Sequence, residues 1–365
     1  MQTLRVVFAG GGTGGHLYPA IAIAEAFQRR VQNFPCVFIG TSRGLEARVI
    51  PSLGYRLELV PVRGLVRKLT PGNLLVPVYL MQSIRQCLRL FKEFQPHLVV
   101  GTGGYVSGPA LMAAWLSRRK FVVQEQNSFP GLVNRWWGER ADLAFLSFAE
   151  SKKFFRRQEH LRVVGNPVRG SLIIGDRIAA ATKWNLAPDR TTLLVFGGSQ
   201  GARRINELIQ EILPRLAVLE NFQILWATGP SHIDKMAPDV ASLPNIRAVP
   251  YIDDMASAYT LADFVLCRAG ASTIFELTSC GLPAILVPFP FATADHQTFN
   301  ARALENAGAA RLLIEKETTP EKLFQTVHEL AAQPLLRRQM AEAAKKLARP
   351  RAAEEIVEEC LSLVL

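Results

Sequence analysis

A glycine-rich loop followed by a histidine is the first part of the chain that could do chemistry. Of the residues from Gly10 to Gly15, all are glycine except Thr13, and His16 follows at once. Glycines in such number, placed between an apolar run and a helical segment, indicate backbone N–H groups that approach an anion at a helix N-terminus. A loop that only turned the chain would need one or two glycines. His16 could serve as a general base, because imidazole titrates near neutral pH.

Two familiar uses of a glycine loop fit the neighbouring residues poorly. The spacing Gly10-x-Gly12-x-x-Gly15 matches the dinucleotide-binding fingerprint, but that fingerprint also requires an acidic residue at the end of the second strand. Arg43 follows that strand here, which leaves only a weak NADP interpretation. A P-loop requires lysine and then Ser or Thr after its last glycine, where this chain has His16. A diphosphate group of another kind is the remaining candidate.

A second glycine loop, GTGGYVSGP, covers residues 101–109 and also follows an apolar run. It lies in the same half of the chain as the first loop. Each loop could offer backbone N–H groups to one phosphate, so two such loops in one half would suit a diphosphate.

The third glycine loop, FGGSQGA, contains a pattern that belongs to another class of enzyme. Gly197-x-Ser199-x-Gly201 matches the nucleophile elbow of α/β-hydrolases, and it is expected between a strand and a helix. An aspartate, Asp254 or Asp263, and then His296 would complete the order Ser, Asp, His. A serine esterase using Ser199 is therefore the rival function, although the motif closely echoes the first glycine loop.

The elements that must position these loops form two series along the chain. Short runs rich in Val, Ile, Leu and Phe alternate with segments of helical period, which is typical of parallel sheets covered on both faces. The first series predicts strands at 4–9, 36–40, 57–60, 97–101, 121–124, 143–147 and 161–164. The second predicts strands at 191–197, 222–227, 245–249, 263–267, 284–288 and 310–314. Each series predicts one doubly wound α/β domain.

The two series set the expected domain boundaries. We expect an N-terminal domain at 1–168, a C-terminal domain at 169–350, and a final helix at 351–365 that packs back toward the first domain. A weak internal repeat supports the division, because LLVFGGSQGA answers VVFAGGGTGG. Ligands bind at the carboxyl ends of parallel strands, so a cleft between two Rossmann-like halves is expected to hold the site.

Charge is distributed unevenly over the 365 residues. The formal net charge is +11, and residues 1–168 carry 22 Lys and Arg against nine Asp and Glu. An anionic partner is therefore expected for the first half only. The five cysteines are scattered without a CxxC pair, which predicts neither a disulfide framework nor a zinc site. No signal peptide and no membrane-spanning segment are expected from the apolar runs.

The segment after Asn73 could give the first half an anionic membrane surface as its partner. Asn73 is expected to cap a helix, and the apolar residues near its start are Leu74, Leu75, Val76, Val78, Tyr79, Leu80 and Met81. Further on, one face carries Ile84, Leu88 and Phe91, and another carries Arg85, Arg89 and Lys92. This pattern suits docking on an anionic bilayer, and equally an ordinary helix with a core face. Nucleic acid is disfavoured, because no nucleic-acid-reading motif is present.

Eight motifs in order resemble those of one family of glycosyltransferases. They are GGGTGGHLYPA, GTGGYVSGP, EQNSFPGLVNRW, VVGNPVR, FGGSQGA, YIDDM, RAGASTIFEL and DHQTFNA. The resemblance is to the MurG-type transferases, which move N-acetylglucosamine from its UDP-sugar to undecaprenyl-pyrophosphoryl-MurNAc-pentapeptide and so turn lipid I into lipid II in peptidoglycan synthesis. It implies the GT-B architecture of two Rossmann-like domains. Another UDP-sugar lipid glycosyltransferase is the alternative within that architecture.

The resemblance also implies partners and a location. UDP-N-acetylglucosamine would be the donor, undecaprenyl-linked lipid I the acceptor, and no further cofactor would be required. The protein would sit peripherally at the cytoplasmic face of the bacterial inner membrane, with other cell-wall and division proteins as further partners. Because the chain has no Asp-x-Asp motif, no metal clamp is expected, and helix N-termini and polar side chains must stabilise the departing UDP.

The residues implied for the acceptor side come from the first domain. In an inverting displacement the acceptor's 4-hydroxyl attacks the anomeric carbon, and a base must take its proton. The resemblance makes His16 that general base, with Glu125 as a back-up base. The residues implied for the acceptor diphosphate are Gly103, Gly104 and Tyr105. SFPG after EQN and GLVRKL after Arg63 depart from the family pattern on this side, which leaves details of the acceptor open.

The donor contacts implied by the resemblance come from both domains. They are Thr13, Gly14, Gly15, Asn127, Arg169, Ser199, Ile252, Ala271, Ser272, Thr273, Ile274, Phe275, Glu276 and Gln297. The backbone of Ile252 would read the uracil edge, and Glu276 would accept both ribose hydroxyls. Gln297, with Asn300 nearby, would hold the sugar hydroxyls. Arg169, Ser199 and the helix entered at Ala271 would meet phosphate.

Overall fold

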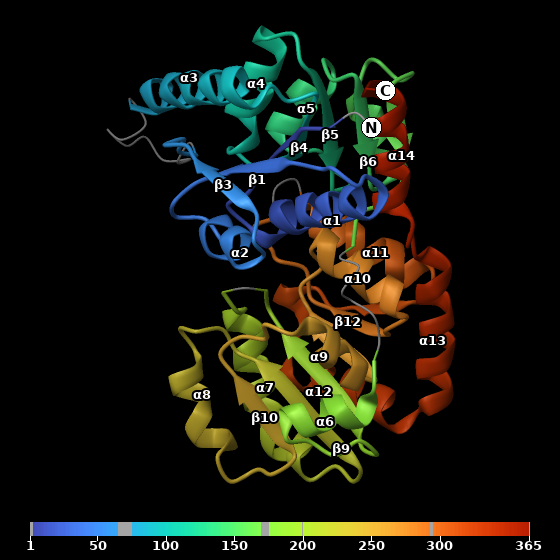
Figure 1. Ribbon diagram of the computed structural model, residues 1–365. Coiled ribbons are helices and arrows are strands. Elements are labelled where there is room, and N and C mark those ends of the chain that lie inside the picture. The colour runs from blue at the N-terminus through green and yellow to red at the C-terminus, as the bar shows by residue number, and fades with distance from the viewer. Residues whose placement is uncertain (1–2, 65–74, 169–174, 199, 293–294, 365) are drawn as a thin grey trace. The chain divides into compact units, whose positions relative to one another are not determined.

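The computed structural model describes residues 3–64, 75–168, 175–198, 200–292 and 295–364. The chain forms two compact units (Figure 1). Unit 1 comprises Met1–Gly170 together with Arg349–Leu365, and unit 2 comprises Ser171–Ala348. Each unit is described by itself below.

Unit 1 is built on a seven-stranded parallel sheet in the order β3-β2-β1-β4-β5-β6-β7. Its strands are β1 (Val6–Gly10), β2 (Cys36–Gly40), β3 (Arg56–Leu59), β4 (Leu98–Gly103), β5 (Lys120–Glu125), β6 (Leu143–Leu146) and β7 (Leu161–Val163). The central strands are buried on both faces, which explains their unbroken apolar sequences. The carboxyl ends of β1, β4 and β5 are neighbours, so the segments that follow them meet at one edge.

Helices cover both faces of this sheet. They are α1 (Gly14–Arg30), α2 (Glu46–Ser52), α3 (Val76–Phe94), α4 (Ser107–Leu116), α5 (Leu132–Gly138), a 3₁₀ helix at Ala149–Phe154, and α14 (Ala352–Val364). One core lies between the sheet and α1, where the buried side chains of Ile356, Val357 and Cys360 bring α14 against α1 (Figure 1). The other core lies under α3 and α4. The last helix of the chain thus belongs to the unit that contains the first strand.

Helix α3 divides into a core half and an outward apolar half. Its buried residues are Ser83, Ile84, Cys87, Leu90 and Phe91, whereas Leu88 is only half-buried. The apolar side chains near its start are exposed instead, and we call Leu75, Val78, Leu80 and Met81 the α3 patch. Asn73 and Leu74, expected at the start of this helix, lie outside the described residues. The core face that one alternative expected is therefore found in the second half of the helix, whereas docking on a membrane stays a prediction.

Unit 2 repeats the same design with a six-stranded parallel sheet in the order β10-β9-β8-β11-β12-β13. Its strands are β8 (Thr191–Phe196), β9 (Phe222–Ala227), β10 (Ile246–Val249), β11 (Phe264–Cys267), β12 (Ala284–Leu286) and β13 (Ala310–Leu312). Its helices are α6 (Arg177–Trp184), α7 (Arg203–Ala217), α8 (Ile233–Val240), α9 (Met255–Leu261), α10 (Ala271–Cys280), α11 (His296–Asn306), α12 (Pro320–Ala332) and α13 (Pro334–Leu347), with a 3₁₀ turn at Glu315–Glu317. A separate core lies on each face. The predicted fold class, two doubly wound parallel-sheet domains, is confirmed.

Candidate active site

The two glycine loops of unit 1 close on each other around His16. A Cβ atom added to Gly104 would lie 2.6 Å from the carbonyl oxygen of Gly11, and one added to Gly103 would lie 2.9 Å from Nδ1 of His16. Both glycines also have positive φ angles, +101° at Gly103 and +75° at Gly104, which side chains disfavour. The second loop thus needs its glycines so that its backbone can approach the first loop and the imidazole. Tyr105, beside them, is exposed.

His16 is held at the first turn of α1 by both neighbouring strand ends. Its half-buried ring places Nδ1 2.8 Å from Oε1 of Gln126, which follows β5. Its backbone carbonyl accepts a hydrogen bond of 2.7 Å from the hydroxyl of Thr102 in β4. The histidine therefore has a defined position at the carboxyl edge of the sheet, where Rossmann-like folds bind their ligands.

Glu125 is engaged on both carboxylate oxygens. Oε1 accepts from the backbone N–H of Asn127 at 2.8 Å and from its side-chain amide at 3.1 Å. Oε2 accepts from the backbone N–H of Gly131 at 3.0 Å and from the amide of Asn134 at 2.9 Å. The side chain is only 1% exposed. These contacts make Glu125 the organiser of the loop that carries Gln126 and Asn127.

Glu46 contacts the first glycine loop, although no sequence pattern singled it out. Its buried carboxylate accepts hydrogen bonds of 2.9 Å from the N–H of Gly12 and from both the N–H and the hydroxyl of Thr41. A Cβ atom on Gly11 or Gly40 would lie 2.6 Å or 2.4 Å from atoms of this side chain. The N–H that a dinucleotide pyrophosphate would use is thus occupied by an internal carboxylate, which argues against the NADP interpretation. At the N-terminus of α1, Thr13 and Gly15 are exposed and Gly14 is half-buried.

The glycine loop of unit 2 packs tightly on the segment after β9. A Cβ atom on Gly201 would lie 2.2 Å from the carbonyl oxygen of Thr228, and one on Gly229 would lie 2.4 Å from that of Gln200. Both glycines have positive φ angles. Close backbone packing therefore accounts for these glycines. Ser199 itself lies outside the described residues.

The aspartates that would complete a hydrolase triad are used elsewhere. Asp263 comes directly before β11 and accepts hydrogen bonds from the N–H of Thr192, at 2.7 Å, and from Arg177, at 2.8 Å. It thus lies at the amino edge of the sheet, whereas an elbow serine needs its acid at the carboxyl edge. Asp254 caps α9, and its pairing with Lys183 at 2.6 Å lowers its pKa. The structure therefore does not support the esterase.

Helix α10 presents its N-terminus at the carboxyl end of β11. Its N-cap is Gly270, which has no side chain to cap the helix, and its first turn carries no acidic residue. The side chains of Ser272 and Thr273 are half-buried, whereas the predicted contacts Ala271, Ile274 and Phe275 have buried side chains. Those three could meet a ligand only through the backbone. A helix N-terminus of this kind attracts anions.

Tyr259, in α9, positions Glu276 of α10. Sequence reasoning missed this tyrosine. Its hydroxyl donates a 2.9 Å hydrogen bond to Oε2 of Glu276, and both side chains are buried. Burial, aided by the nearby Glu276, raises the pKa of Tyr259 well above its usual value, so the phenol stays protonated and donates. Ile252 is buried in the neighbouring core, which leaves only its backbone to read a base.

Arg268 connects the strand ends that carry the remaining predicted donor residues. It pairs with Glu315 at 2.5 Å and donates to the carbonyl oxygens of Val287 and Pro288 at 3.1 Å and 3.0 Å. The next residues on that segment are tied to α11, because the N–H of Phe289 donates to Oε1 of Gln297 at 2.9 Å. The amide nitrogen of Gln297 is therefore the group that it can offer to a sugar hydroxyl.

Asn300 also links α11 to the end of β11, through a 3.2 Å bond from its amide to the carbonyl oxygen of Ala269. The loops after β11 and β12 and the start of α11 thus form one connected edge. Within the described ranges, no group of three or more His, Cys, Asp and Glu side chains could hold a metal ion.

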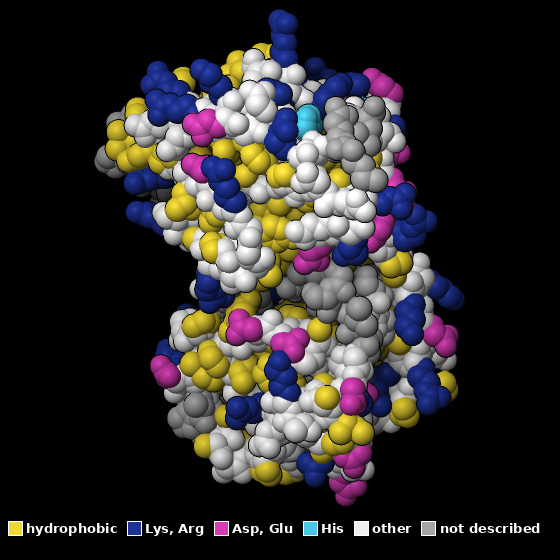
Figure 2. All heavy atoms as spheres, in the orientation of Figure 1, with side chains coloured by type: hydrophobic (Ala, Val, Ile, Leu, Met, Phe, Trp, Pro, Cys, Tyr) yellow, Lys and Arg dark blue, Asp and Glu magenta, His cyan; other side chains and the backbone are white. Residues whose placement is uncertain are grey.

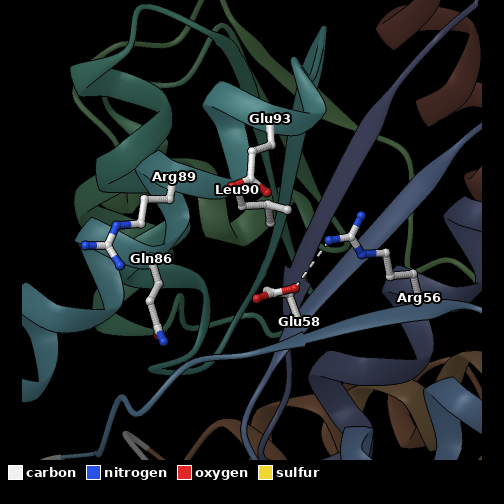
Figure 3. A pocket seen from close by; sticks show the side chains of 6 residues that line it. All are labelled: Arg56, Glu58, Gln86, Arg89, Leu90 and Glu93. Atoms are coloured by element: carbon white, nitrogen blue, oxygen red, sulfur yellow. Dashed lines mark ion pairs between the residues drawn. The ribbon is translucent and has the colours of Figure 1, made fainter.

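Two pockets, each lined by described residues of one unit, lie away from these strand ends. One, of about 210 Å³ beside β3 and the C-terminal half of α3, is lined by Arg56, Glu58, Gln86, Arg89, Leu90 and Glu93 (Figure 3). Figure 3 shows Glu58 directed at Arg56, with 3.6 Å between their charged atoms. The lining carries two arginines and two glutamates, so its charges do not favour an anionic diphosphate. A second pocket, of about 200 Å³, lies near Thr191 at the amino end of β8.

Comparison with known proteins identifies the family. The glycosyltransferase family 28 N-terminal domain matches residues 6–146, and the family 28 C-terminal domain matches residues 192–356. A protein of Prosthecochloris aestuarii is 44% identical over 357 residues, 97% of each chain, and one of Salinibacter ruber is 45% identical over 98% of this chain and 96% of its own. Both are UDP-N-acetylglucosamine–N-acetylmuramyl-(pentapeptide) pyrophosphoryl-undecaprenol N-acetylglucosamine transferases. The chain belongs to this MurG-type family.

Solved structures agree with this assignment. The crystal structure of MurG from Acinetobacter baumannii matches with a TM-score of 0.73 and 29% identity, covering 97% of this chain and 98% of that one. A putative UDP-N-acetylglucosamine 2-epimerase from Listeria monocytogenes matches with a TM-score of 0.69 at 14% identity, over 98% and 95% of the two chains, which shows a shared fold alone. The resemblance to MurG-type transferases, drawn from eight motifs, is confirmed.

The predicted site residues of this MurG-type transferase fall into two groups, one at the carboxyl edge of the sheet in each unit. Unit 1 brings together His16, the two glycine loops, Glu125 and Asn127. Unit 2 gathers the start of α10 and the start of α11. Arg169 and Ser199 lie outside the described residues. Sequence reasoning missed the buried polar residues that support these groups, namely Glu46, Gln126, Asn134, Tyr259 and Arg268.

Proposed function

We propose that this protein is an inverting glycosyltransferase that moves N-acetylglucosamine from UDP-N-acetylglucosamine to the 4-hydroxyl of undecaprenyl-pyrophosphoryl-MurNAc-pentapeptide. The product would be lipid II, the precursor of peptidoglycan. The observation that carries the proposal is the 38–45% identity, over 97% or more of the chain, to transferases named for these substrates. A glycine-loop histidine in one unit and an open helix N-terminus in the other supply groups that such a reaction needs.

On the acceptor side, His16 is proposed as the general base. As the acceptor oxygen forms its bond to the anomeric carbon, the bond from that carbon to the UDP oxygen breaks, and the hydroxyl proton passes to the imidazole. His16 is half-buried at the carboxyl edge of the sheet, with Gly103 and Gly104 close against its ring. Glu125 instead shapes the loop, because four donors already engage its buried carboxylate. Gly103, Gly104 and Tyr105 stay proposals for the acceptor diphosphate.

On the donor side, the N-terminus of α10 is proposed to face the diphosphate of UDP. Negative charge grows on the leaving group as the glycosidic bond breaks, and a fixed helix dipole stabilises it without reorganisation. Glu276, held by Tyr259, would meet the ribose, and Gln297 would offer its amide nitrogen to the sugar. The remaining donor contacts are proposed from the family resemblance, namely Thr13, Gly14, Gly15, Asn127, Arg169, Ser199 and the backbone of Ile252.

The α3 patch supports peripheral docking on an anionic membrane. Val78 and Met81 are 50% and 51% exposed, although both are apolar. Farther along the helix, Arg85, Arg89 and Lys92 are exposed, and Figure 2 shows hydrophobic and basic side chains together over α3. Each basic residue near an anionic surface contributes about 1 kcal/mol, so three contribute about 3 kcal/mol beside the apolar contacts. Among the described residues, no helix has the length and hydropathy needed to cross a membrane.

From the family resemblance, we propose that the membrane on which the enzyme docks is the bacterial inner membrane, at its cytoplasmic face. There the water-soluble UDP-sugar and the lipid-linked acceptor are both within reach. Contacts with other cell-wall and division proteins are proposed from the family resemblance alone.

The proposal is tested by following label from UDP-N-acetylglucosamine into lipid. Purified protein is incubated with the radiolabelled donor and a lipid I analogue, and the lipid fraction is counted, with UDP-glucose as the donor control. We expect transfer of the N-acetyl sugar only, and a loss of about 10²-fold or more in kcat for His16→Ala. An absence of transfer, together with covalent labelling of Ser199 by a fluorophosphonate, would establish the esterase instead. A His16→Ala variant with full activity would remove His16 as the base.

A further inference from the structure

We propose that Gln126 is a positioning residue that holds His16 in one tautomer, with the proton on Nδ1 and an unprotonated Nε2 as the proton acceptor. The inference rests on the proposed role of His16 as the general base. It gives a role to Gln126 in EQN and Asn166 in VVGNPVR, two residues that have no part in the reaction proposed above. We call Gln124, Gln126 and Asn166 the amide relay.

The surroundings of Gln126 determine which way its amide points. The Nε2 atom lies 2.6 Å from the carbonyl oxygen of Thr102, 3.0 Å from the carbonyl oxygen of Gln124 and 2.5 Å from Oε1 of Gln124. Backbone carbonyls only accept hydrogen bonds, so the end of the amide that faces them must be the NH₂ group. The other end, Oε1, therefore faces His16 at 2.8 Å.

This orientation decides the tautomer of the histidine. An amide oxygen can only accept, so Nδ1 of His16 must be the donor and must carry the proton. In the neutral ring the lone pair is then on Nε2. That is the nitrogen which can receive a proton from the acceptor hydroxyl, and the tautomer is thus the one that general-base catalysis requires.

The amide relay continues away from the site and fixes Gln126 in turn. The side-chain nitrogen of Gln124 donates to Oδ1 of Asn166 at 3.1 Å and to the hydroxyl of Ser147 at 3.2 Å. The hydroxyl of Ser147 in turn donates a hydrogen bond of 2.8 Å to the carbonyl oxygen of Glu125. The three amides of the relay are at most 1% exposed, so water does not compete for these bonds. Because the nitrogen of Gln126 faces two backbone carbonyls in this buried network, only one arrangement of donor and acceptor is open to Gln126.

A neutral amide has an advantage over a carboxylate next to His16. A carboxylate would orient the ring equally well, but it would also stabilise the imidazolium and keep the base protonated near neutral pH. The amide orients the ring without adding charge, so the neutral form remains ready to accept a proton. This predicts that glutamine and glutamate at this position have different effects on the pH dependence of transfer.

The experiment reads the tautomer directly by NMR. Protein labelled with ¹⁵N only in its histidines gives long-range ¹H–¹⁵N spectra in which a protonated ring nitrogen and an unprotonated one resonate far apart. The signals of His16 are identified by their absence from His16→Ala, since the chain has six histidines. We expect the wild type to show Nδ1 protonated and Nε2 unprotonated at neutral pH.

Variants then connect the tautomer to the reaction. Gln126→Met keeps the length of the side chain and removes the amide, whereas Gln28→Met makes the same change at an exposed glutamine of unit 1 and serves as the control. For Gln126→Met we expect a mixed tautomer and a fall of about 10²-fold in kcat with a small change in KM for the donor, because general-base catalysis contributes 10²–10⁴-fold. For Gln126→Glu we expect the acidic limb of the pH profile to move to higher pH.

Several outcomes would overturn the inference. A wild-type ring with the proton on Nε2 would do so without any variant, even if Gln126→Met failed to fold. An unchanged tautomer in a folded Gln126→Met protein would also do so, whatever its activity. A failure of the proposed base can be told apart from these two outcomes. A fully active His16→Ala variant would show that His16 is not the base, and the tautomer measured in the wild type would be unaffected by that result.

Discussion

Replacing Glu125 by glutamine separates a positioning carboxylate from a chemical base. The carboxylate accepts four hydrogen bonds, two on each oxygen, and glutamine keeps only one of those oxygens. Two donors would then face an NH₂ group. Asn134 can meet that NH₂ group by turning its amide only if it gives up the 3.0 Å hydrogen bond that its nitrogen donates to the carbonyl oxygen of Gln124.

The magnitude follows from the number of bonds that cannot be recovered. A hydrogen bond to a charged group is worth about 1.5–3 kcal/mol, so the loss of one to two of them should lower the free energy of unfolding by about 2–5 kcal/mol. This is a large share of the 5–15 kcal/mol typical of a folded protein. Glu150→Gln, at an exposed position of the same unit, is the matched control and should be neutral.

The assay combines urea unfolding with transfer kinetics. If Glu125 only positions the loop, the folded Glu125→Gln variant should keep kcat within about tenfold of the wild type, whereas His16→Ala should lose about 10²-fold or more. The reasoning would be refuted by a Glu125→Gln protein that is as stable as the wild type and yet loses 10²-fold or more in kcat. That result would make Glu125 the base.

Three further results are expected. Tyr259→Phe removes the hydroxyl that holds Glu276; KM for the donor should rise with little change in kcat, and an unchanged KM would contradict the positioning role. Val78→Asp with Met81→Asp should weaken sedimentation with anionic vesicles while leaving the urea midpoint unchanged, because both side chains are exposed; equal vesicle binding would remove the α3 patch from docking. Burial raises the pKa of the Cys36 thiol to about 11, so about one thousandth is thiolate at pH 8 and its alkylation should speed up about tenfold per pH unit between 7 and 9, whereas a pH-independent rate would contradict this.

The sequence was most informative about the sheets. Strands buried on both faces must be apolar throughout, so runs such as 36–40 and 222–227 coincide with β2 and β9. Other strand ends differ from their predictions by up to two residues; after β12, for example, the apolar pattern continues past the last ladder bond. The anion binding predicted for the glycine loops stays a prediction, whereas close approach and positive φ explain why Gly103 and Gly104 are glycines.

The supporting polar residues could not be found in the same way. Gly12 and Glu46 are 34 residues apart, and His16 and Gln126 are 110 apart, so no local spacing connects the partners. Periodicity likewise could not say which apolar residues of α3 remain uncovered. That depends on how much of the helix packs on α4 and the sheet. Met81 and Leu90 are both apolar residues of this helix, yet Met81 is exposed and Leu90 is buried. Such residues are fixed by tertiary contacts.

The stereochemistry of the product tests the transfer most directly. The donor carries its sugar in the α configuration, so a single inverting displacement by the acceptor's 4-hydroxyl must give a β-(1→4) disaccharide on the lipid. We would incubate the protein with UDP-N-acetylglucosamine and a lipid I analogue, isolate the lipid, and read the anomeric proton coupling and the linkage by NMR. A β-(1→4)-linked N-acetylglucosamine is the expected result. An α linkage, attachment at another hydroxyl, or free N-acetylglucosamine in place of a lipid product would contradict it.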